Sequence, residues 1–334
     1  MEPISRRAAL KRIFAAIAAT GASSFLTFDD LVAADRTERQ AAAGGDDPRL
    51  NLIWLHGTSC SGCSVSLLNI EYVPVVDILT KFTNMIFHHD VSLATGDQVT
   101  DIFRRLKGSG LPYVLVFEGA VPTAMPHACM LGHRMITEWV DELAEGAEAC
   151  VAAGTCAAFA GVTRMNGMET GSMALDEYLA HRGIERPVIN LPGCPMKPEH
   201  LVYSVLHYAH EGGPPRLDDR GRPMRFFSHT IHDRCIYYSD FQENYFAEYI
   251  GDDGCLLKLG CQGVVTRNDC LINGHNSNTN SCIRAGHPCI GCAGEHFPRR
   301  IMLHTYDDNR PVVRQFQQRS QRQTRGGSGG GGGQ

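Results

Sequence analysis

The sequence predicts an α/β protein with a flavodoxin-like parallel-sheet domain, followed by a smaller loop-rich domain that is lined with cysteines. Short apolar runs alternate with helix-length amphipathic segments between residues 50 and 208. Beyond residue 208 the hydrophobic periodicity fades, and seven of the 13 cysteines crowd into residues 235–292. The length of 334 residues is enough for two domains of ordinary size.

The first domain, residues 48–212, takes its predicted fold from five short apolar runs. Runs of this length are typical of strands that are buried on both faces. The predicted strands are residues 52–55, 84–87, 113–117, 150–153 and 187–190. Between them lie segments of helical length, such as residues 99–106 and 133–143. This alternation implies a parallel sheet with helices on both faces.

Cysteines follow three of the predicted strands. Cys60 and Cys63 come after the first strand, Cys156 after the fourth, and Cys194 after the fifth. The carboxyl ends of parallel strands form a common crevice, so these thiols are expected to meet at one edge. Four thiolates are the usual ligands of a 4Fe–4S cluster. A thiol–disulfide enzyme is the alternative for the Cys-x-x-Cys pair, and zinc also accepts four thiolates.

The cysteine count and the net charge restrict the function further. An odd count in a chain of this length argues against a disulfide framework, and thiols at this density usually ligate metal. Cys129 and Cys150 lie within or before regular elements and are expected to pack in the core. The formal net charge of -5 gives no electrostatic case for a nucleic-acid partner.

The second domain, residues 213–310, begins within a linker of turn-forming composition at residues 212–219. It is poor in long apolar runs, so metal binding is expected to supply part of its folding energy. Its candidate ligands are, in chain order, His232, Cys235, Cys255, Cys261, Cys270, Cys282, Cys289 and Cys292. Spacing does not fix which ligand belongs to which site, and two zinc sites are nearly as good an interpretation as iron–sulfur clusters.

The two ends of the chain are expected to lie outside these domains. Residues 1–34 contain Arg6-Arg7 and then a small apolar run, which resembles a twin-arginine export signal. A basic amphipathic helix that stays on the protein is the alternative. Residues 311–334 form a polar, glycine-rich tail that is expected to be disordered. No apolar run of ~20 residues follows the cysteine-rich region, so no transmembrane anchor of the chain's own is expected.

Six motifs, taken in order, resemble the signatures of nickel–iron hydrogenase small subunits. They are Cys60-x-Gly62-Cys63-Ser64-x-Ser66, Glu118-Gly119-x-x-Pro122-Thr123, Gly154-Thr155-Cys156, Pro192-Gly193-Cys194-Pro195, Ile231-His232-Asp233-x-Cys235 and Pro288-Cys289-Ile290-Gly291-Cys292. The likeness covers residues 50–298, and the leader matches the exported members of that family. The expected location is therefore the periplasm or the outer face of the cytoplasmic membrane.

The resemblance implies an electron-transferring subunit with three iron–sulfur clusters and no catalytic residue of its own. In the family, the nickel–iron site belongs to a separate large subunit, so none is expected in this chain. Electrons are expected to pass between that site and an external acceptor, such as a cytochrome or a quinone-linked membrane subunit. The implied ligands are Cys60, Cys63, Cys156 and Cys194 for a proximal 4Fe–4S cluster, and His232, Cys235, Cys255 and Cys261 for a distal 4Fe–4S cluster.

The medial cluster is expected to use Cys270, Cys289 and Cys292 together with Cys282. Many family members have a proline at the position of Cys282 and hold a three-iron cluster, whereas nickel–iron–selenium relatives have a cysteine. The resemblance therefore implies a medial 4Fe–4S cluster, whose extra thiolate charge lowers its potential. A free Cys282 beside a 3Fe–4S cluster is the alternative.

Two departures from the family pattern and three rival interpretations complete the prediction. Oxygen-tolerant relatives carry extra cysteines at positions that match Gly62 and Gly161, so their protective cluster is not expected here. Ser59 stands where many members have a glutamate. The rivals are a hydrogen-sensing regulatory subunit, a one-cluster quinone-reductase subunit, and a zinc-bound scaffold without redox chemistry.

Overall fold

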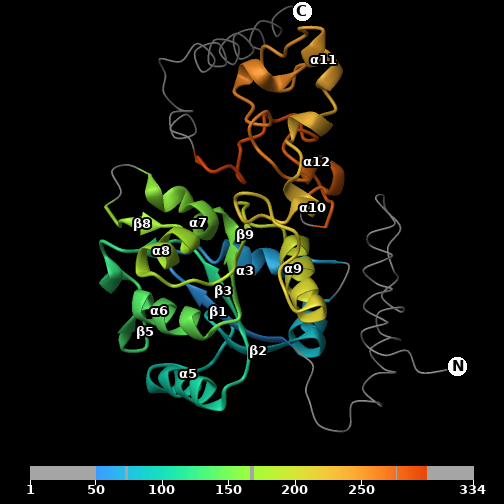
Figure 1. The fold of residues 1–334 in the computed structure, drawn as a ribbon. Coiled ribbons are helices and arrows are strands. Elements are labelled where there is room, and N and C mark those ends of the chain that lie inside the picture. The colour runs from blue at the N-terminus through green and yellow to red at the C-terminus, as the bar shows by residue number, and fades with distance from the viewer. Residues whose placement is uncertain (1–49, 72–73, 166–168, 276, 299–334) are drawn as a thin grey trace, which may run out of the picture.

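The computed structural model describes residues 50–71, 74–165, 169–275 and 277–298. Figure 1 shows a sheet flanked by helices and, beyond one end of the sheet, a smaller region of loops and short helices. The predicted leader, residues 1–34, and the predicted tail, residues 311–334, lie outside the described residues. Within the described ranges, no helix is both long and apolar enough to span a membrane.

A five-stranded parallel sheet forms the centre of the first part. Its strands are β1 (Leu50–His56), β2 (Thr83–His88), β3 (Val114–Glu118), β7 (Ala149–Ala153) and β9 (Val188–Leu191). Their spatial order is β2-β1-β3-β7-β9, which is 2-1-3-4-5 by chain order and therefore flavodoxin-like. The predicted fold class is confirmed, with small shifts at the strand ends. One shift places Glu118 inside β3 rather than after it.

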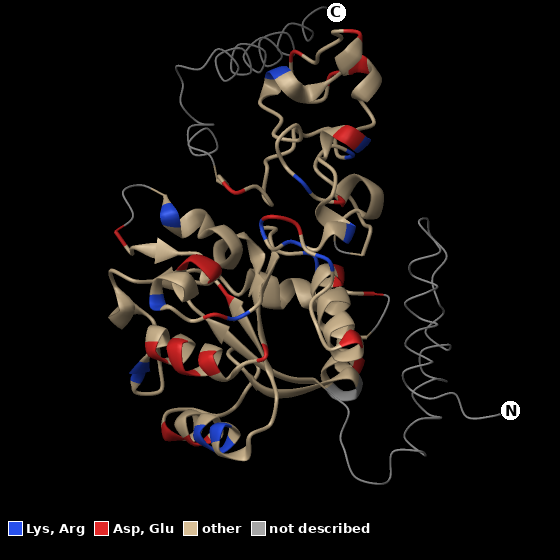
Figure 2. Ribbon diagram, viewed as in Figure 1, with Lys and Arg blue, Asp and Glu red and all other residues tan. Residues whose placement is uncertain are grey.

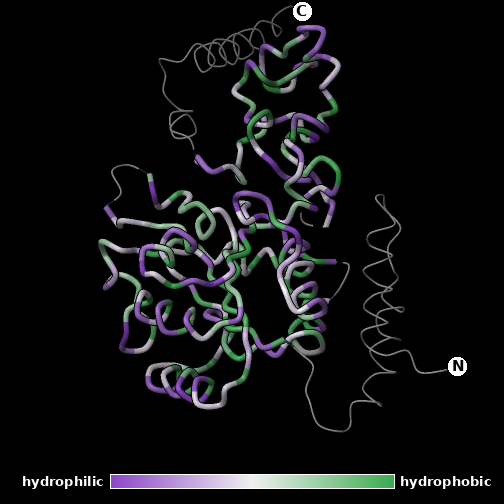
Figure 3. The backbone as a smooth tube through the Cα atoms, in the orientation of Figure 1, coloured by the Kyte–Doolittle hydropathy of each residue, from purple (hydrophilic) through white to green (hydrophobic). Residues whose placement is uncertain are grey.

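Alternate residues of each strand pack into two cores on opposite faces of the sheet, as the two-residue period of a strand requires. In β1, Ile53 and Leu55 join one core, while Leu52 and Trp54 join the other. The first face is covered by α5 (Asp97–Ser109), α6 (Ile136–Gly146), α7 (Gly154–Phe159) and α8 (Leu175–Arg182). The second is covered by α3 (Gly62–Leu67) and α9 (Pro198–Glu211). Figure 3 shows the apolar strands enclosed between these helices.

Helix α6 begins at Ile136, so the predicted helix at residues 133–143 started too early. The preceding residues form a hairpin instead, in which β5 (Met130–Leu131) pairs antiparallel with β6 (Arg134–Met135). Gly132 makes this turn with a φ of +62°, a conformation that glycine adopts without strain. The other short elements of this part are α4 (Val75–Asp77), η1 (Ile78–Phe82), β4 (Val121–Pro122), η2 (Pro126–Ala128), η3 (Gly161–Arg164) and β8 (Ser172–Met173).

The second part is built from loops and single helical turns. Its elements are α10 (Met224–Phe227), η4 (His232–Arg234), α11 (Tyr238–Gln242), η5 (Leu256–Leu259) and α12 (Cys270–Asn273). The buried clusters described here are small: one contains Ile231, Leu271, Ile283 and Cys289, and another centres on Phe227. Figure 2 shows charged residues on the outer helices of the first part, while the central strands are mostly uncharged.

Specific hydrogen bonds join the two parts. Thr155 Oγ1 donates to the carbonyl of Cys292. Ser277 Oγ donates to the carbonyl of Asn69 over 2.9 Å and accepts the N–H of Glu71 over 2.8 Å. These bonds fix the cysteine-rich loops over the carboxyl edge of the sheet.

Candidate metal centres

The first group of thiols lies at the carboxyl edge of the sheet. Cys60 and Cys63 lie on the turn from β1 into α3, Cys156 lies in the first turn of α7, and Cys194 follows β9. Burial raises the pKa of the Cys63 thiol, and nearby Cys156 and Cys194 raise it further. Burial likewise raises the pKa of Cys156 to about 11, and Cys194 and Cys60 act in the same direction. The structure thus brings the four predicted residues together, and we call them the sheet-edge thiols.

Glycines make room for these sulfurs. Gly154 has a φ of +87°, and a Cβ built on it would overlap Cys63 Sγ. A Cβ on Gly161 would lie 2.9 Å from Cys156 Sγ, and one on Gly62 would lie 3.1 Å from Cys60 Sγ. Side chains at these positions would therefore fill the space around the thiols.

Glu118 organises the loop that carries Cys60 and Cys63. The N-cap of α3, Ser61, has a φ of 59° and forms no side-chain cap. Glu118 reaches over from β3 instead and accepts the N–H of Cys63 over 3.1 Å and of Ser64 over 3.0 Å. Its Oε1 also accepts the hydroxyl of Ser59 over 2.8 Å. A carboxylate at the N-terminus of a helix stabilises the free N–H groups there.

The charge of Glu118 is retained despite its burial. Burial acts to raise its pKa, but hydrogen bonds from His56, Ser64 and Ser59 prevail and lower the pKa to about 2. His56 Nε2 lies 3.3 Å from Glu118 Oε2. The sequence contained Glu118 within a motif but gave no signal of this role, because its partners are more than 50 residues away in the chain.

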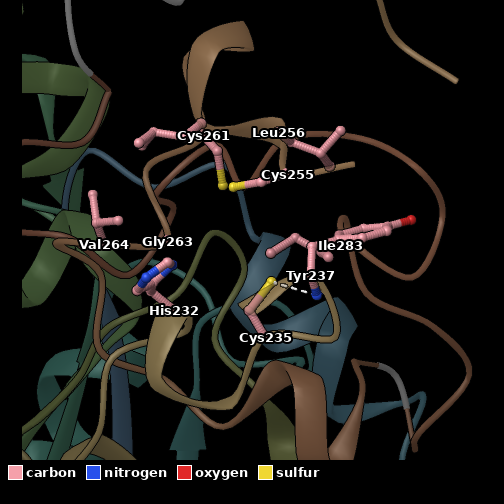
Figure 4. Close-up of a pocket in the computed structure, with 10 residues that line it drawn as sticks. His232, Cys235, Tyr237, Cys255, Leu256, Cys261, Gly263, Val264 and Ile283 are labelled. Carbon is pink, nitrogen blue, oxygen red and sulfur yellow. Dashed lines mark hydrogen bonds between the residues drawn. The ribbon is translucent and has the colours of Figure 1, made fainter. Parts of the chain in front are cut away.

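The second group, His232, Cys235, Cys255 and Cys261, lines one pocket. Figure 4 shows their side chains around a common space, with Ile283 and Tyr237 beside it. Backbone amides point at the sulfurs: Tyr237 N–H donates to Cys235 Sγ over 3.4 Å. We call these four residues the outer set.

The third group consists of Cys270, Cys282, Cys289 and Cys292, which we call the inner set. Cys270 and Cys289 are held in the apolar cluster around Leu271. Burial raises the pKa of Cys289 to about 12, and nearby Cys261, Cys292 and Cys282 raise it as well. Cys282 itself is exposed. The structure therefore places all four predicted residues in one neighbourhood.

The inner set lies between the other two groups. Burial raises the pKa of Cys194 to about 11, and Cys292 is the nearby thiol that raises it most. Thr155 Oγ1 connects the two groups through the backbone, since it accepts the N–H of Gly193, next to Cys194, over 2.8 Å and donates to the carbonyl of Cys292. On the other side, Cys289 N–H donates to Cys261 Sγ over 3.3 Å. The three groups thus follow one another from the sheet edge, through the inner set, to the outer set.

The donor chemistry of these groups suits iron–sulfur clusters. Two groups offer only thiols, and the outer set offers three thiols and an imidazole. Amide N–H groups directed at sulfur are a means by which proteins adjust cluster potentials. In the part of the chain that the structure describes, no three His, Cys, Asp or Glu side chains are gathered tightly enough for a single metal ion. Of the remaining cysteines, Cys150 is fully buried in β7 and Cys129 packs against the same core, as predicted.

Comparisons with protein families agree with this organisation. Residues 227–305 match the family model described as the C-terminal domain of NiFe/NiFeSe hydrogenase small subunits. Residues 60–208 match the model of the 20 kDa subunit of NADH ubiquinone oxidoreductase. This second match ends at residue 208 and does not extend into the cysteine-rich second part.

Individual relatives extend the likeness over most of the chain. The periplasmic NiFeSe hydrogenase small subunit of Desulfomicrobium baculatum is 35% identical, over 74% of this chain and 84% of the relative. The periplasmic NiFe hydrogenase small subunit 1 of Nitratidesulfovibrio vulgaris Hildenborough is 34% identical, over 75% of this chain and 80% of the relative.

Solved structures show the same fold. The NiFeSe hydrogenase structure from Dm. baculatum matches with a TM-score of 0.70 and 33% identity, over 75% of this chain and 96% of that chain. The actinobacterial-type NiFe hydrogenase of Ralstonia eutropha H16 matches with a TM-score of 0.68 and 28% identity, over 79% and 84% of the two chains. Its fold, the order of its thiol groups and its likeness to these relatives show one thing together. The chain belongs to the family of nickel–iron hydrogenase small subunits.

Proposed function

We propose that this chain relays electrons between a nickel–iron site in a separate large subunit and an external acceptor. The sheet-edge thiols would hold a proximal 4Fe–4S cluster, the inner set a medial cluster, and the outer set a distal 4Fe–4S cluster. The observation that carries the proposal is the succession of the three groups, linked by Thr155 between Gly193 and Cys292 and by Cys289 N–H at Cys261 Sγ. Nothing in the fold or the relatives favours a sensor or a zinc scaffold.

The residues of this chain bind the proposed clusters, enclose them and adjust their redox potentials. Bound iron–sulfur clusters supply one-electron redox chemistry. Cysteine thiolates hold them, and amide groups such as Met196 N–H, 3.4 Å from Cys63 Sγ, stabilise negative charge on the sulfurs. No described side chain is required as an acid or base for the hydrogen chemistry, which we assign to the partner.

The medial cluster is proposed to be of the 4Fe–4S type. Cys282 raises the pKa of both Cys289 and Cys292, so its thiol lies close enough to these two members of the inner set to act on them electrostatically. Electron paramagnetic resonance separates the alternatives, because an oxidised 3Fe–4S cluster is paramagnetic and an oxidised 4Fe–4S cluster of this class is not. A 3Fe signal in the oxidised protein would leave Cys282 as a free thiol.

The proposed partner is a hydrogenase large subunit, and the proposed acceptor is a cytochrome or a quinone-linked membrane subunit. Obligate interfaces of this kind bury more surface than the ~1,600 Å² of an ordinary complex, and that surface is more apolar.

We also propose export through the twin-arginine pathway to the periplasm or the outer face of the cytoplasmic membrane. The periplasmic relatives support this location.

Replacing one sheet-edge thiol tests the relay. In the purified heterodimer, Cys63→Ala removes a ligand of the proposed proximal cluster and is expected to abolish hydrogen-dependent dye reduction. Cys129→Ala is the matched control, because Cys129 is a partly buried thiol that packs against the core away from the three groups. Metal analysis of both variants reports iron content independently of activity. Dye reduction at the full rate in C63A would show that the proximal assignment is wrong.

A further inference from the structure

Three buried polar side chains lie where the sheet domain meets the cysteine-rich region. Lys197 is 1% exposed, His200 0% and Asp269 7%. Lys197 Nζ donates to Asp269 Oδ1 over 2.8 Å, and His200 Nε2 lies 3.0 Å from the same oxygen. The other carboxylate oxygen, Oδ2, accepts from Asn273 Nδ2 over 2.7 Å. We call Lys197, His200 and Asp269 the junction triad.

The junction triad lies between two of the thiol groups. Lys197 is the N-cap of α9 and follows the sheet-edge thiol Cys194 by three residues. Asp269 is the N-cap of α12 and directly precedes Cys270 of the inner set. One ion pair therefore joins the two domains at the point where the proposed proximal and medial sites approach each other.

Stability alone does not explain a buried ion pair here. Taking an ammonium and a carboxylate out of water costs several kcal/mol per ion, and apolar residues of similar volume often serve as well. The third member lies in apolar surroundings, since the His200 ring stacks on Phe226 at 4.2 Å and meets Phe227 edge-on at 5.0 Å. Burial lowers the pKa of His200, which keeps its imidazole neutral. The net charges of the triad are then those of Lys197 and Asp269.

The junction triad places a buried cation next to the inner set. Asp269 directly precedes Cys270 and holds Lys197 Nζ at 2.8 Å, and both side chains are buried, so solvent screens their charges little. The Lys197 ammonium opposes the negative charge that a fourth thiolate, Cys282, would add to a medial cluster.

We propose that Lys197 is a charge-setting and positioning residue of the medial site, with Asp269 and His200 holding its ammonium beside Cys270. The inference rests on the proposed function of the inner set. In this arrangement Lys197 keeps the potential of the medial site higher than it would be without this cation. It also fixes the orientation of the inner set toward the sheet edge.

The test is a redox titration of the purified heterodimer, followed by electron paramagnetic resonance. Lys197→Met keeps an unbranched chain of similar length and removes the charge. We expect the midpoint potential of the medial signal to fall, while the proximal and distal potentials shift less. Lys197→Arg restores a cation and is expected to return the medial potential toward that of the wild type.

A second variant separates charge from structure. K197M leaves the Asp269 carboxylate buried without its cation, whereas K197M/D269N removes both charges. Because removing the neighbouring anion offsets the loss of the cation, the double variant is expected to have a higher medial potential than K197M. If both variants retain iron and keep the wild-type medial potential, and only their thermal stability falls, the triad is a structural clasp and the inference is overturned.

Metal analysis of the wild type comes before these variants. Wild-type protein that holds zinc in place of iron would overturn the proposed function itself, and this inference with it. Wild-type protein with three clusters leaves the medial potential as the deciding measurement. The two kinds of failure are therefore distinguishable.

Discussion

At the residue scale, Glu118 does for α3 what a capping side chain would otherwise do. Its carboxylate accepts two backbone N–H groups at the start of the helix, including that of Cys63. A hydrogen bond to a charged group contributes about 1.5–3 kcal/mol, so these bonds stabilise the loop that carries Cys60 and Cys63. The thiol geometry therefore depends on a residue that need not touch metal.

His88 makes the fold sensitive to acid. Burial lowers the pKa of His88 from 6.5 to about 4, and its Nδ1 accepts the N–H of Asp90 over 3.1 Å. Since the unfolded chain binds this proton more tightly, the stability that neutral His88 contributes is fully present above pH 6.5 and is lost as the pH falls toward 4. We expect the thermal unfolding midpoint to fall on acidification through this window, and to fall less in H88Q. An H88Q profile that superimposes on the wild type would place the acid sensitivity elsewhere.

At the element scale, the turn from β7 into α7 depends on a glycine that packs against a thiol. G154A adds a Cβ that overlaps Cys63 Sγ, whereas G183A adds one in open space at a similar positive φ. Both variants carry the left-handed backbone cost of about 1–2 kcal/mol. Only G154A is expected to lose iron, by the roughly four atoms of one cluster. Equal iron in the two purified variants would contradict the close packing of Gly154 against Cys63.

The sequence predicts the elements of the sheet domain far better than the contacts between them. Local apolar runs predict the five strands, and the motifs predict the cysteines that come after these strands as ligands. The start of α6 was predicted wrongly, because the hairpin before it is set by a glycine turn that a helical period does not reveal. The link from Lys197 to Asp269 spans 72 residues, and only the folded chain brings the two side chains together.

At the scale of the whole molecule, the two parts differ in how they are held together. In the described residues, the cores of the sheet domain contain 23 and 16 buried residues, while those of the cysteine-rich part contain four and three. A region with a hydrophobic core this small usually needs disulfides or bound metal for its stability. The second part is therefore expected to need its proposed clusters in order to fold.

Removing the iron tests this dependence. After chelation under oxidising conditions, we expect amide hydrogen exchange to become fast in residues 223–298 and to stay slow in β3 and β7. These two strands serve as the internal control, because they are buried along their whole length. Unchanged protection of residues 223–298 in iron-free protein would mean that this part folds without metal.

The hydrogen bonds between Ser277 and the Asn69–Glu71 turn have a consequence for biosynthesis. Ser277 lies 66 residues beyond Glu211, the last residue of α9, and a ribosome needs about 3–13 s to add them at ~5–20 residues per second. During this interval the sheet domain can form with its thiol-bearing edge still uncovered. The newly made chain therefore has a short period in which the first cofactor can be delivered, and this period ends once Ser277 has been translated and has bonded to the Asn69–Glu71 turn.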